Sequence, residues 1–375
     1  MKKLITFTVS LGLIISSIGN AFACTALIVT DTKGNAYKGR GYEFSVDVPS
    51  MITYLPAGSK IESFTPSGAK GKTFNTKYPI LGVTLAAIPG AKHPLFVDAA
   101  NDQGLTISLN ALNNSSSPPV GNDNSKILAA PDLGGWILGS FKSVAEAKAA
   151  LLSDDTQFWL PAIAVMGNRP FPLHYAIWDK TGAGIVLEFT NGKKNVYDNP
   201  VNVMTNGPEF PWHLENLNNY TFTNVDKNTG QLGKLKLQTQ DAGIALAALP
   251  SAETATGRFV KAAFYANYVR KGKTPDEAIV TLGHIMNNFD RPYDLTVDGA
   301  GGMGDGPRSK GLSSEVSSYI VMNDLAGNRF YYRGIESLNW AVIDMNKLKN
   351  VTIMKTVSAK EVDKAGADSF NLFYK

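Results

Sequence analysis

Residues 21–30 read AFACTALIVT and contain Cys24, the only cysteine in a chain of 375 residues. The segment after it, residues 25–30, is apolar and rich in β-branched residues, which predicts a strand. A turn at residues 31–35 and a second extended stretch at residues 36–44 follow. The sequence therefore predicts a hairpin that starts at the lone thiol.

The chain begins with the features of a secretory signal peptide. Lys2 and Lys3 precede an apolar run at residues 4–15, and the sequence Ala-Phe-Ala stands directly before Cys24. We expect cleavage to remove residues 1–23 and to make the cysteine the first residue of the mature protein. The apolar run is too short for a membrane span. We therefore expect a periplasmic or secreted protein that has no membrane attachment after cleavage.

Charge and length narrow the class of protein. The formal net charge is +4, and loss of residues 1–23 removes two lysines and no acidic residue, which leaves +2. A nearly neutral chain gives no reason to expect binding to nucleic acid or to an anionic membrane. The chain is long enough for a large core. Since no linker, repeat or low-complexity segment divides it, we expect residues 24–375 to form a single domain.

Short strands predominate, and helices gather in the middle of the chain. Strand patterns flank turns in three further pairs, at residues 95–98 and 105–109, 174–178 and 185–189, and 319–322 and 329–333. Helical patterns occupy residues 144–152, 258–270 and 276–287. This order predicts an α+β domain in which helices cover antiparallel sheets.

A lone cysteine in an exported chain has three interpretations. It is a structural thiol, the lipid-modified first residue of a lipoprotein, or a reactive residue. The bulky Phe22 next to the cleavage site fits a lipoprotein signal poorly. As a free first residue, Cys24 would carry a thiol nucleophile and an α-amine whose pKa of about 7.7–8.0 suits a general base. Cleavage would then create the base that the nucleophile needs.

The motifs of other common catalytic sites are absent from the sequence, although a papain-like Cys–His pair is possible in principle. There is no G-x-S-x-G motif, no H-E-x-x-H motif and no second cysteine for a thiolate metal site. The four histidines, His93, His174, His213 and His284, lack the spacing of metal ligands, and we interpret them as surface or core residues. We therefore expect neither a metal nor a cofactor.

The sequence resembles the choloylglycine hydrolase family, the bile salt hydrolases and penicillin V acylases, over essentially the whole mature chain. The segments that carry the resemblance are CTALIV at 24–29, GRGYEF at 39–44, NPVNVMTNGPEFPWHLENLNNY at 199–220, GRFVKAAF at 257–264, HIMNNF at 284–289 and AVIDMNKL at 341–348. It implies an N-terminal nucleophile hydrolase fold, a four-layer αββα sandwich in which two antiparallel sheets lie between layers of helices. The nucleophile would stand at the end of a strand.

The resemblance also implies roles for individual residues. Arg40 matches the arginine next to the nucleophile Cys24, Asn206 the asparagine of the oxyanion hole, and Arg258 a second active-site arginine. Glu43 stands where the bile salt hydrolases have an aspartate, and it resembles the exported Gram-negative members in this. Its longer side chain would hold the α-amine and would change the shape of the pocket.

The second oxyanion donor that the resemblance implies is a backbone N–H within residues 104–112. Ungapped matching places this donor at Ala111, and a shift of one residue places it at Asn110. The sequence does not decide between the two positions. A backbone donor needs no particular side chain, so either position is compatible with function.

Each side chain also has a purely structural interpretation. Arg40, Glu43 and Arg258 could form a buried ion network without a catalytic role, and Asn206 could cap a turn before Pro208. Their distances from the thiol distinguish these interpretations.

The resemblance implies a periplasmic amidase that acts on a small-molecule acyl amide. Because the chain resembles the exported members more than the intracellular bile salt hydrolases, penicillin V and N-acyl homoserine lactones are the favoured substrates, and conjugated bile salts are the alternative. A lipid-anchored periplasmic binding protein is the alternative from another class, and a family member that only binds ligand is a third. Family members are commonly homotetramers. We expect pocket loops at residues 113–126 and 298–311, and Tyr42, Phe44 and Trp212 as either pocket or core residues.

Overall fold

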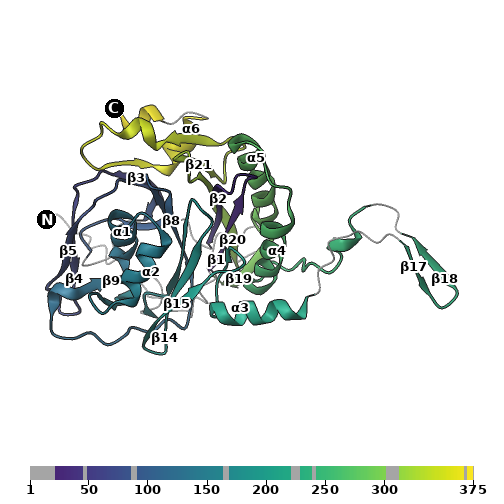
Figure 1. Cartoon of the computed structure of the whole chain (residues 1–375), viewed down its shortest axis with the longest axis horizontal. Helices are drawn as coiled ribbons and strands as arrows, with labels where there is room; N and C mark the ends of the chain where they lie inside the picture. The colour runs from purple at the N-terminus through teal and green to yellow at the C-terminus, as the bar shows by residue number, and fades with distance from the viewer. Residues whose placement is uncertain are drawn as a thin grey trace, which may run out of the picture.

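The computed structural model describes residues 22–44, 49–85, 91–163, 169–220, 229–238, 242–300, 312–366 and 370–374. Most of the predicted signal peptide therefore lies outside the described residues. Two large antiparallel sheets make up the body of the protein (Figure 1).

The first sheet contains the predicted N-terminal hairpin. Its strand order is β16 (Val203–Met204), β1 (Phe22–Thr30), β2 (Ala36–Phe44), β20 (Leu312–Asp324), β21 (Arg329–Gly334) and β22 (Ala341–Asp344), and β19 (Thr296–Ala300) pairs with β20. The ladder of the hairpin runs from the Phe22–Phe44 pair to the Thr30–Ala36 pair. It thus starts two residues before Cys24, because in the full chain the preceding residues continue the pairing with β2.

The second sheet holds two of the other predicted strand pairs. Its order is β15 (Lys193–Asp198), β14 (Gly184–Thr190), β13 (Leu173–Asp179), β8 (Leu105–Ala111), β7 (Leu95–Asn101), β6 (Ile80–Leu85), β3 (Met51–Leu55) and β23 (Lys355–Ser358). The pairs β7–β8 and β13–β14 are antiparallel, as is β20–β21 in the first sheet. All three strand-pair predictions are confirmed.

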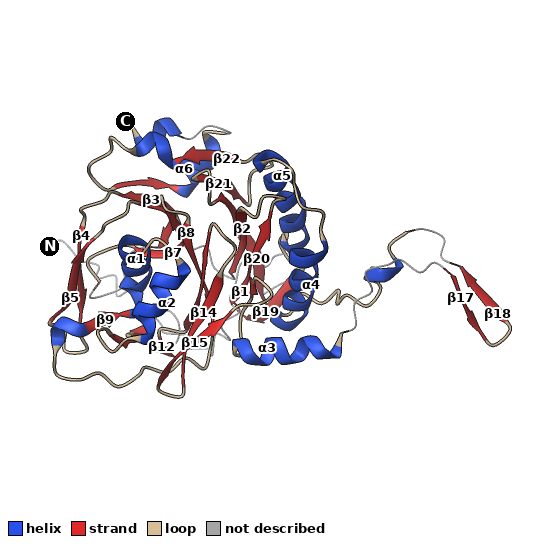
Figure 2. Cartoon of the chain, in the orientation of Figure 1, coloured by secondary structure: helices blue, strands red, loops and turns tan. Residues whose placement is uncertain are grey.

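Helices cover the outer face of each sheet (Figure 2). The pair α1 (Ala130–Ser140) and α2 (Val144–Leu152) packs on the second sheet, and the pair α4 (Ala255–Tyr268) and α5 (Pro275–Met286) packs on the first. This arrangement is the predicted αββα layering. The predicted helix at residues 258–270 begins three residues earlier, because Thr254 Oγ1 accepts a hydrogen bond from Gly257 N and caps the helix there.

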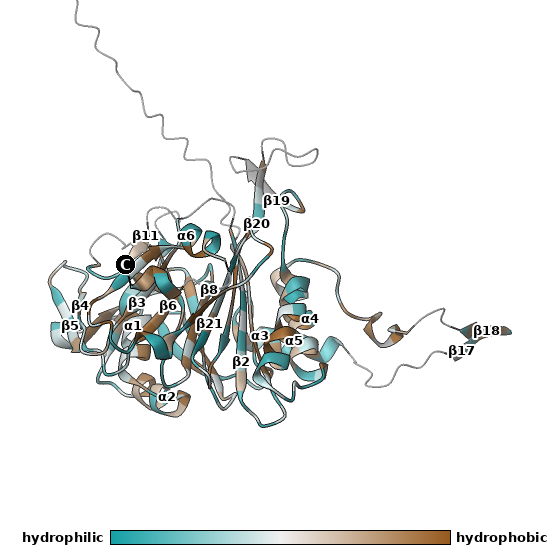
Figure 3. Ribbon diagram, turned by 90° about the horizontal axis from the view of Figure 1, so that it is seen from above, coloured by the Kyte–Doolittle hydropathy of each residue, from teal (hydrophilic) through white to brown (hydrophobic). Residues whose placement is uncertain are grey.

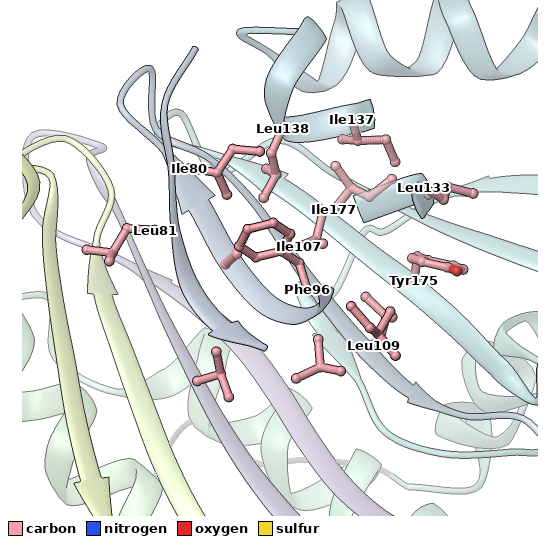
Figure 4. Close-up of a cluster of buried hydrophobic side chains, with 14 of the residues drawn as sticks. Ile80, Leu81, Phe96, Ile107, Leu109, Leu133, Ile137, Leu138, Tyr175 and Ile177 are labelled. Carbon is pink, nitrogen blue, oxygen red and sulfur yellow. The ribbon is translucent and has the colours of Figure 1, made fainter. Parts of the chain in front are cut away.

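Close packing joins α1 to the second sheet. Leu133 and Ile137 of α1 lie over Ile107 and Ile177, and all four side chains are fully buried (Figure 4). A Cβ atom at Gly134 would lie 2.6 Å from the side chain of Ile107. Glycine at this position therefore lets the helix approach the sheet closely.

Shorter elements complete the described chain. Four two-stranded ladders pair β4 (Lys60–Phe64) with β5 (Lys70–Asn75), β9 (Ile127–Ala129) with β10 (Gln157–Trp159), β11 (Ala162–Ile163) with β12 (Arg169–Pro170), and β17 (Thr229–Leu232) with β18 (Leu235–Gln238). Two short helices are α3 (Phe210–Asn216) and α6 (Ala359–Lys364). The β17–β18 hairpin stands away from the layered body (Figure 3). Within the described part of the chain, no helix is both long and apolar enough to cross a membrane.

Candidate active site

Cys24 lies near the start of β1, and its side chain points into the space between the two sheets. It is 1% exposed and belongs to the same buried cluster as Tyr42 and Tyr319 of the neighbouring strands. Because side chains alternate along a strand, Thr25 faces the opposite side, toward α4. The thiol is therefore an inward-facing group, whereas the backbone of residue 24 can be reached from the helix-covered face.

Arg40 on β2 lies beside the thiol of Cys24. Its Nη2 lies 3.4 Å from Cys24 Sγ and donates a hydrogen bond to Leu109 O at 2.6 Å. Its Nη1 donates to Tyr319 Oη at 3.0 Å, and its guanidinium carbon lies 4.8 Å from the centre of the Tyr42 ring. These contacts fix a buried cation beside the sulfur, where the sequence predicted it.

Asn206 contacts the backbone nitrogen of residue 24. Its Oδ1 accepts hydrogen bonds from Cys24 N at 2.7 Å and from Arg258 Nη2 at 2.9 Å. Its Nδ2 is buried and has no hydrogen-bond partner among the described residues. The side chain thus joins segments 182 residues apart and does not act as a local turn cap. Its acceptor is occupied, and its donor is available to a ligand.

Arg258 in the first turns of α4 holds the carbonyl of residue 24. Its Nη1 donates to Cys24 O at 2.6 Å and to Thr25 Oγ1 at 2.7 Å, and its Nε donates to Glu253 O at 3.0 Å. Burial lowers the pKa of Arg258, and the neighbouring Glu43 opposes this effect. Three side chains therefore reach residue 24 at three different atoms: the sulfur, the nitrogen and the carbonyl oxygen.

Glu43 lies two strand positions beyond Gly41 on the helix-covered side of the sheet. A Cβ atom at Gly41 would lie 2.5 Å from Glu43 Oε1, so glycine leaves room for the carboxylate. Both carboxylate oxygens are buried and have no hydrogen-bond partner among the described residues. The predicted contact with an amine is not seen, because Cys24 N is a peptide nitrogen in the full chain and its one hydrogen goes to Asn206.

Burial and charge shift the acidity of both acidic groups in the site. Burial raises the pKa of Glu43 to about 7, while Arg258, Arg291 and Arg40 oppose the increase. Burial also raises the pKa of the Cys24 thiol, while Arg40 lowers it. The arginines therefore counteract the cost of charge in a dry site.

The ladder between β8 and β13 distinguishes the two candidates for the backbone donor. Asn110 pairs with His174, and Leu112 N donates to Pro172 O two positions further along. Hydrogen-bonded and non-hydrogen-bonded pairs alternate in an antiparallel ladder. The N–H of Asn110 therefore faces β13, whereas the N–H of Ala111 faces away from it.

The backbone N–H and carbonyl of Ala111 face the segment that contains Asn206. Its carbonyl accepts a hydrogen bond from Gly207 N at 3.0 Å, and the N–H and carbonyl of a strand residue point to the same side. Asn110 instead contributes its side chain, whose Nδ2 donates to Met204 O at 3.1 Å and to Thr205 O at 3.0 Å. This geometry favours Ala111 as the backbone donor.

Two buried histidines support the same segment, and sequence reasoning gave them no role. His174 contacts Glu188 Oε1 through Nδ1 and Thr205 O through Nε2, both at 2.8 Å. His213 Nε2 lies 2.8 Å from Asn206 O. Burial lowers the pKa of His213 to about 4. The interpretation of these two histidines as core residues is consistent with their burial, and their partners lie too far away in the sequence to be found from spacing.

A cavity of about 370 Å³ adjoins the site. Tyr319, whose hydroxyl contacts Arg40, forms part of its wall. Its other lining residues include Met51, Tyr293, Val316, Tyr332 and Ile335. Glu336, Lys360 and Asp363 also line the cavity, so Tyr319 connects a space with both apolar and charged walls to the cation beside the thiol.

The other predicted pocket features lie elsewhere. Tyr42 is buried and stacks on Tyr319, whereas Trp212 is 43% exposed. The segment 113–126 runs beside β14, where Ser115 pairs with Thr190, and does not line this cavity. In the predicted loop 298–311, the first residues belong to β19, and residues 301–311 lie outside the described residues. No group of three or more His, Cys, Asp or Glu side chains that could hold a metal occurs among the residues described.

Comparisons with known proteins agree with this arrangement. Residues 24–355 match the family model of linear amide C–N hydrolases, choloylglycine hydrolase family. A bile salt hydrolase/transferase of Clostridium perfringens is 28% identical over 360 residues, which cover 91% of this chain and all of that protein. A penicillin V acylase of Pectobacterium atrosepticum is 25% identical over 312 residues, 78% of this chain and 76% of that protein.

Solved structures show the same fold. A variant of the conjugated bile acid hydrolase from Clostridium perfringens has a TM-score of 0.73 at 27% identity, and covers 89% of this chain and 96% of its own. The penicillin V acylase from Agrobacterium tumefaciens has a TM-score of 0.67 at 20% identity, with 89% and 90% covered. The chain therefore belongs to the choloylglycine hydrolase family of linear amide C–N hydrolases and has the N-terminal nucleophile hydrolase fold.

Proposed function

We propose that the mature protein is a periplasmic amidase that cleaves acyl amides with Cys24 as its N-terminal nucleophile. One observation carries the proposal: Arg40, Asn206 and Arg258 contact the sulfur, the nitrogen and the carbonyl oxygen of this single residue. Asn206 and Arg258 hold the backbone of residue 24, and a merely structural cysteine would not need the buried guanidinium of Arg40 at 3.4 Å from its sulfur. The predicted cleavage before residue 24 would complete the site by turning its peptide nitrogen into an amine.

The first chemical step would form a thioester. Cys24 Sγ attacks the amide carbonyl carbon, and its own α-amine accepts the thiol proton. Asn206 Nδ2 and the N–H of Ala111 would stabilise the oxyanion that forms on the carbonyl oxygen. When the C–N bond breaks, the α-ammonium group returns its proton to the leaving amine.

Water would complete the reaction. The α-amine takes a proton from water as the oxygen attacks the thioester carbonyl, and the released thiolate takes that proton back. The acyl group leaves as a carboxylic acid. Arg40 would favour the thiolate by its charge, Glu43 would hold the ammonium form of the amine, and Arg258 would keep the backbone of residue 24 in place.

The substrate class is proposed from the site and from the relatives. The predicted signal peptide and Glu43 make the chain resemble the exported Gram-negative members, and this resemblance favours penicillin V and N-acyl homoserine lactones. Conjugated bile salts are a second candidate, since several of the relatives are bile salt hydrolases. The cavity beside Tyr319 has a size that suits the acyl part of such a substrate, and Met51, Val316 and Ile335 give it apolar wall.

A homo-oligomer is part of the proposal. The β17–β18 hairpin exposes Leu232, Leu235 and Leu237, and such apolar side chains on a projecting element are typical of subunit contacts. A molar mass measured by light scattering would test the predicted tetramer. A monomer at all concentrations would contradict it.

A side-by-side hydrolysis assay of the exported, purified protein tests the function. Penicillin V, glycocholate and a long-chain acyl homoserine lactone are each offered to the wild type, with Cys24→Ala as the blank. Turnover of at least one substrate by the wild type alone supports the proposal, and the order of rates gives the substrate class. No turnover, together with a mass that reveals a lipid on Cys24, would favour the lipid-anchored binding protein instead.

A further inference from the structure

A second cluster of buried charge lies directly behind Arg40. Lys38 and Arg40 are two residues apart on β2, so both side chains point into the space between the sheets. Asp98 reaches them from β7 of the facing sheet. All three side chains are completely buried and form one continuous set of ion pairs.

Asp98 makes its hydrogen bonds with other neighbours and not with Arg40. Lys38 Nζ donates to Asp98 Oδ1, and Ser108 Oγ donates to Asp98 Oδ2 at 2.8 Å. The nearest nitrogen of Arg40, its Nε, lies 3.6 Å from Oδ2 and has no hydrogen-bond partner among the described residues. Arg40 directs its Nη2 to the sulfur of Cys24.

The charges of the cluster leave an excess of one positive charge beside the thiol. Burial lowers the pKa of Lys38 to about 8, while the ion pair with Asp98 opposes the decrease and favours the cationic form of the lysine. Burial also disfavours the charge of Arg40, but acidic neighbours that include Asp98 raise its pKa above the ordinary value. Buried charge requires a partner, and a thiolate at residue 24 would supply the missing negative charge.

We infer that Lys38 is a positioning residue for the thiol: it binds the carboxylate of Asp98, which would otherwise compete for Arg40, so that Arg40 stays directed at the sulfur of Cys24 and favours its thiolate. This inference rests on the proposed function, in which the thiolate is the nucleophile. A merely structural ion pair would stabilise the fold but would not direct Arg40 at the sulfur.

Other ionisable groups face the thiol and must be held constant in a test. Glu43 of β2 and Arg258 of α4 act on the thiol through their charge, and Tyr42 and Tyr319 flank the guanidinium of Arg40. The α-amine of the mature protein is a further group. All of these stay in place when only the buried Lys–Asp pair is changed, so differences between variants report on that pair.

Two substitutions should shift the titration midpoint of the thiol in opposite directions. Asp98→Asn is isosteric and removes the anion beside Arg40, so the titration midpoint of the thiol should fall by roughly one pH unit. Lys38→Met leaves Asp98 with Arg40 as its nearest cation and draws that charge away from the sulfur, so the midpoint should rise by roughly one unit. At a pH below the midpoint, alkylation by iodoacetamide should become about tenfold faster and about tenfold slower, respectively.

The measurement is unusually direct because the chain has one cysteine. Ultraviolet thiolate absorbance and the iodoacetamide rate are followed against pH in the mature protein, and the signal of Cys24→Ala is subtracted. Lys148→Met is the matched control, because this lysine pairs with Asp198 at the surface. The control should leave the midpoint unchanged, and circular dichroism verifies that every variant is folded.

The outcomes separate the inference from the proposed function. Opposite shifts in the two variants support the inference. An unchanged midpoint in a folded variant overturns the role of the residue that was replaced, and a shift in the wrong direction overturns the inference as a whole. Asp98→Asn keeps the test decisive if Lys38→Met does not fold. A wild-type thiol that is blocked and cannot be alkylated would overturn the proposed function itself, and this inference with it.

Discussion

Replacement of Asn206 by alanine is the most informative perturbation of the site, because the two ends of this side chain have different partners. Its Oδ1 accepts from Cys24 N and Arg258 Nη2, and its buried Nδ2 has no partner among the described residues. A buried amide donor without a partner carries a desolvation cost. An oxyanion formed next to Cys24 would provide that partner, and only in the transition state.

The expected losses of kcat and of stability follow from the roles of Nδ2 and Oδ1. Loss of one oxyanion donor costs about 2.7–4 kcal/mol, or roughly 100- to 1000-fold in kcat. Loss of Oδ1 removes an acceptor from two buried donors, at about 1–3 kcal/mol of stability for each. We therefore expect Asn206→Ala to lower kcat at least 100-fold and to reduce the free energy of unfolding by a few kcal/mol.

A second variant separates the two effects. Asn206→Asp keeps an oxygen to accept from Cys24 N and Arg258 but replaces the amide donor, so it should retain more stability than Asn206→Ala and still lose kcat. Asn218→Ala, at an exposed asparagine, is the control and should leave both quantities unchanged. The assay is steady-state hydrolysis of the best substrate together with denaturant unfolding. A folded Asn206→Asp or Asn206→Ala protein that keeps kcat within tenfold of the wild type would refute the reasoning.

Four further predictions concern the nucleophile, its amine, metal dependence and pH. Cys24→Ala should abolish turnover while the protein still folds, as judged by circular dichroism, and residual activity would exclude the thiol as nucleophile. A mature chain that retains Ala23 before Cys24 should lose hydrolysis but still react with iodoacetamide, since its thiol remains and its amine does not. Activity should survive EDTA, because no step uses a metal, and loss on chelation would contradict the mechanism. His213, whose pKa is lowered from 6.5 to about 4, stabilises the fold above pH 6.5. That contribution should be lost as the pH falls to about 4, by about 3 kcal/mol relative to His213→Gln in denaturant unfolding.

Local patterns predicted the elements of the fold well, because strand pairs and their turns are encoded in adjacent residues. The hairpin after Cys24 and the three later strand pairs all occur, since alternation and glycine-containing turns act over a few positions. These local patterns do not predict the order of the strands within the sheets. The partners of β1 are β2, adjacent in sequence, and β16, which begins at residue 203. The four-layer arrangement came only from the family resemblance.

Some residues of the site were predicted from the sequence and others were missed, and the difference has a physical cause. Arg40, Asn206 and Arg258 were identified because segments around them match the family, and the structure brings all three to residue 24. The sequence does not reveal the roles of Lys38 and Asp98, because a lysine within a strand looks like a surface residue until its partner is known. That partner comes from the other sheet, 60 residues away.

The geometry of the full chain explains how one cleavage could activate this site without rearranging it. Arg40 already lies against the sulfur, and Arg258 already holds the carbonyl of Cys24, while the peptide N–H donates to Asn206. Removal of the preceding residues would add hydrogens and basicity to that nitrogen and leave the other two contacts as they are. The new amine would have more hydrogens than Asn206 Oδ1 can accept, and Glu43 is the nearby buried carboxylate whose oxygens lack partners among the described residues. The Glu43 carboxylate is therefore available to bind the ammonium group that cleavage would create.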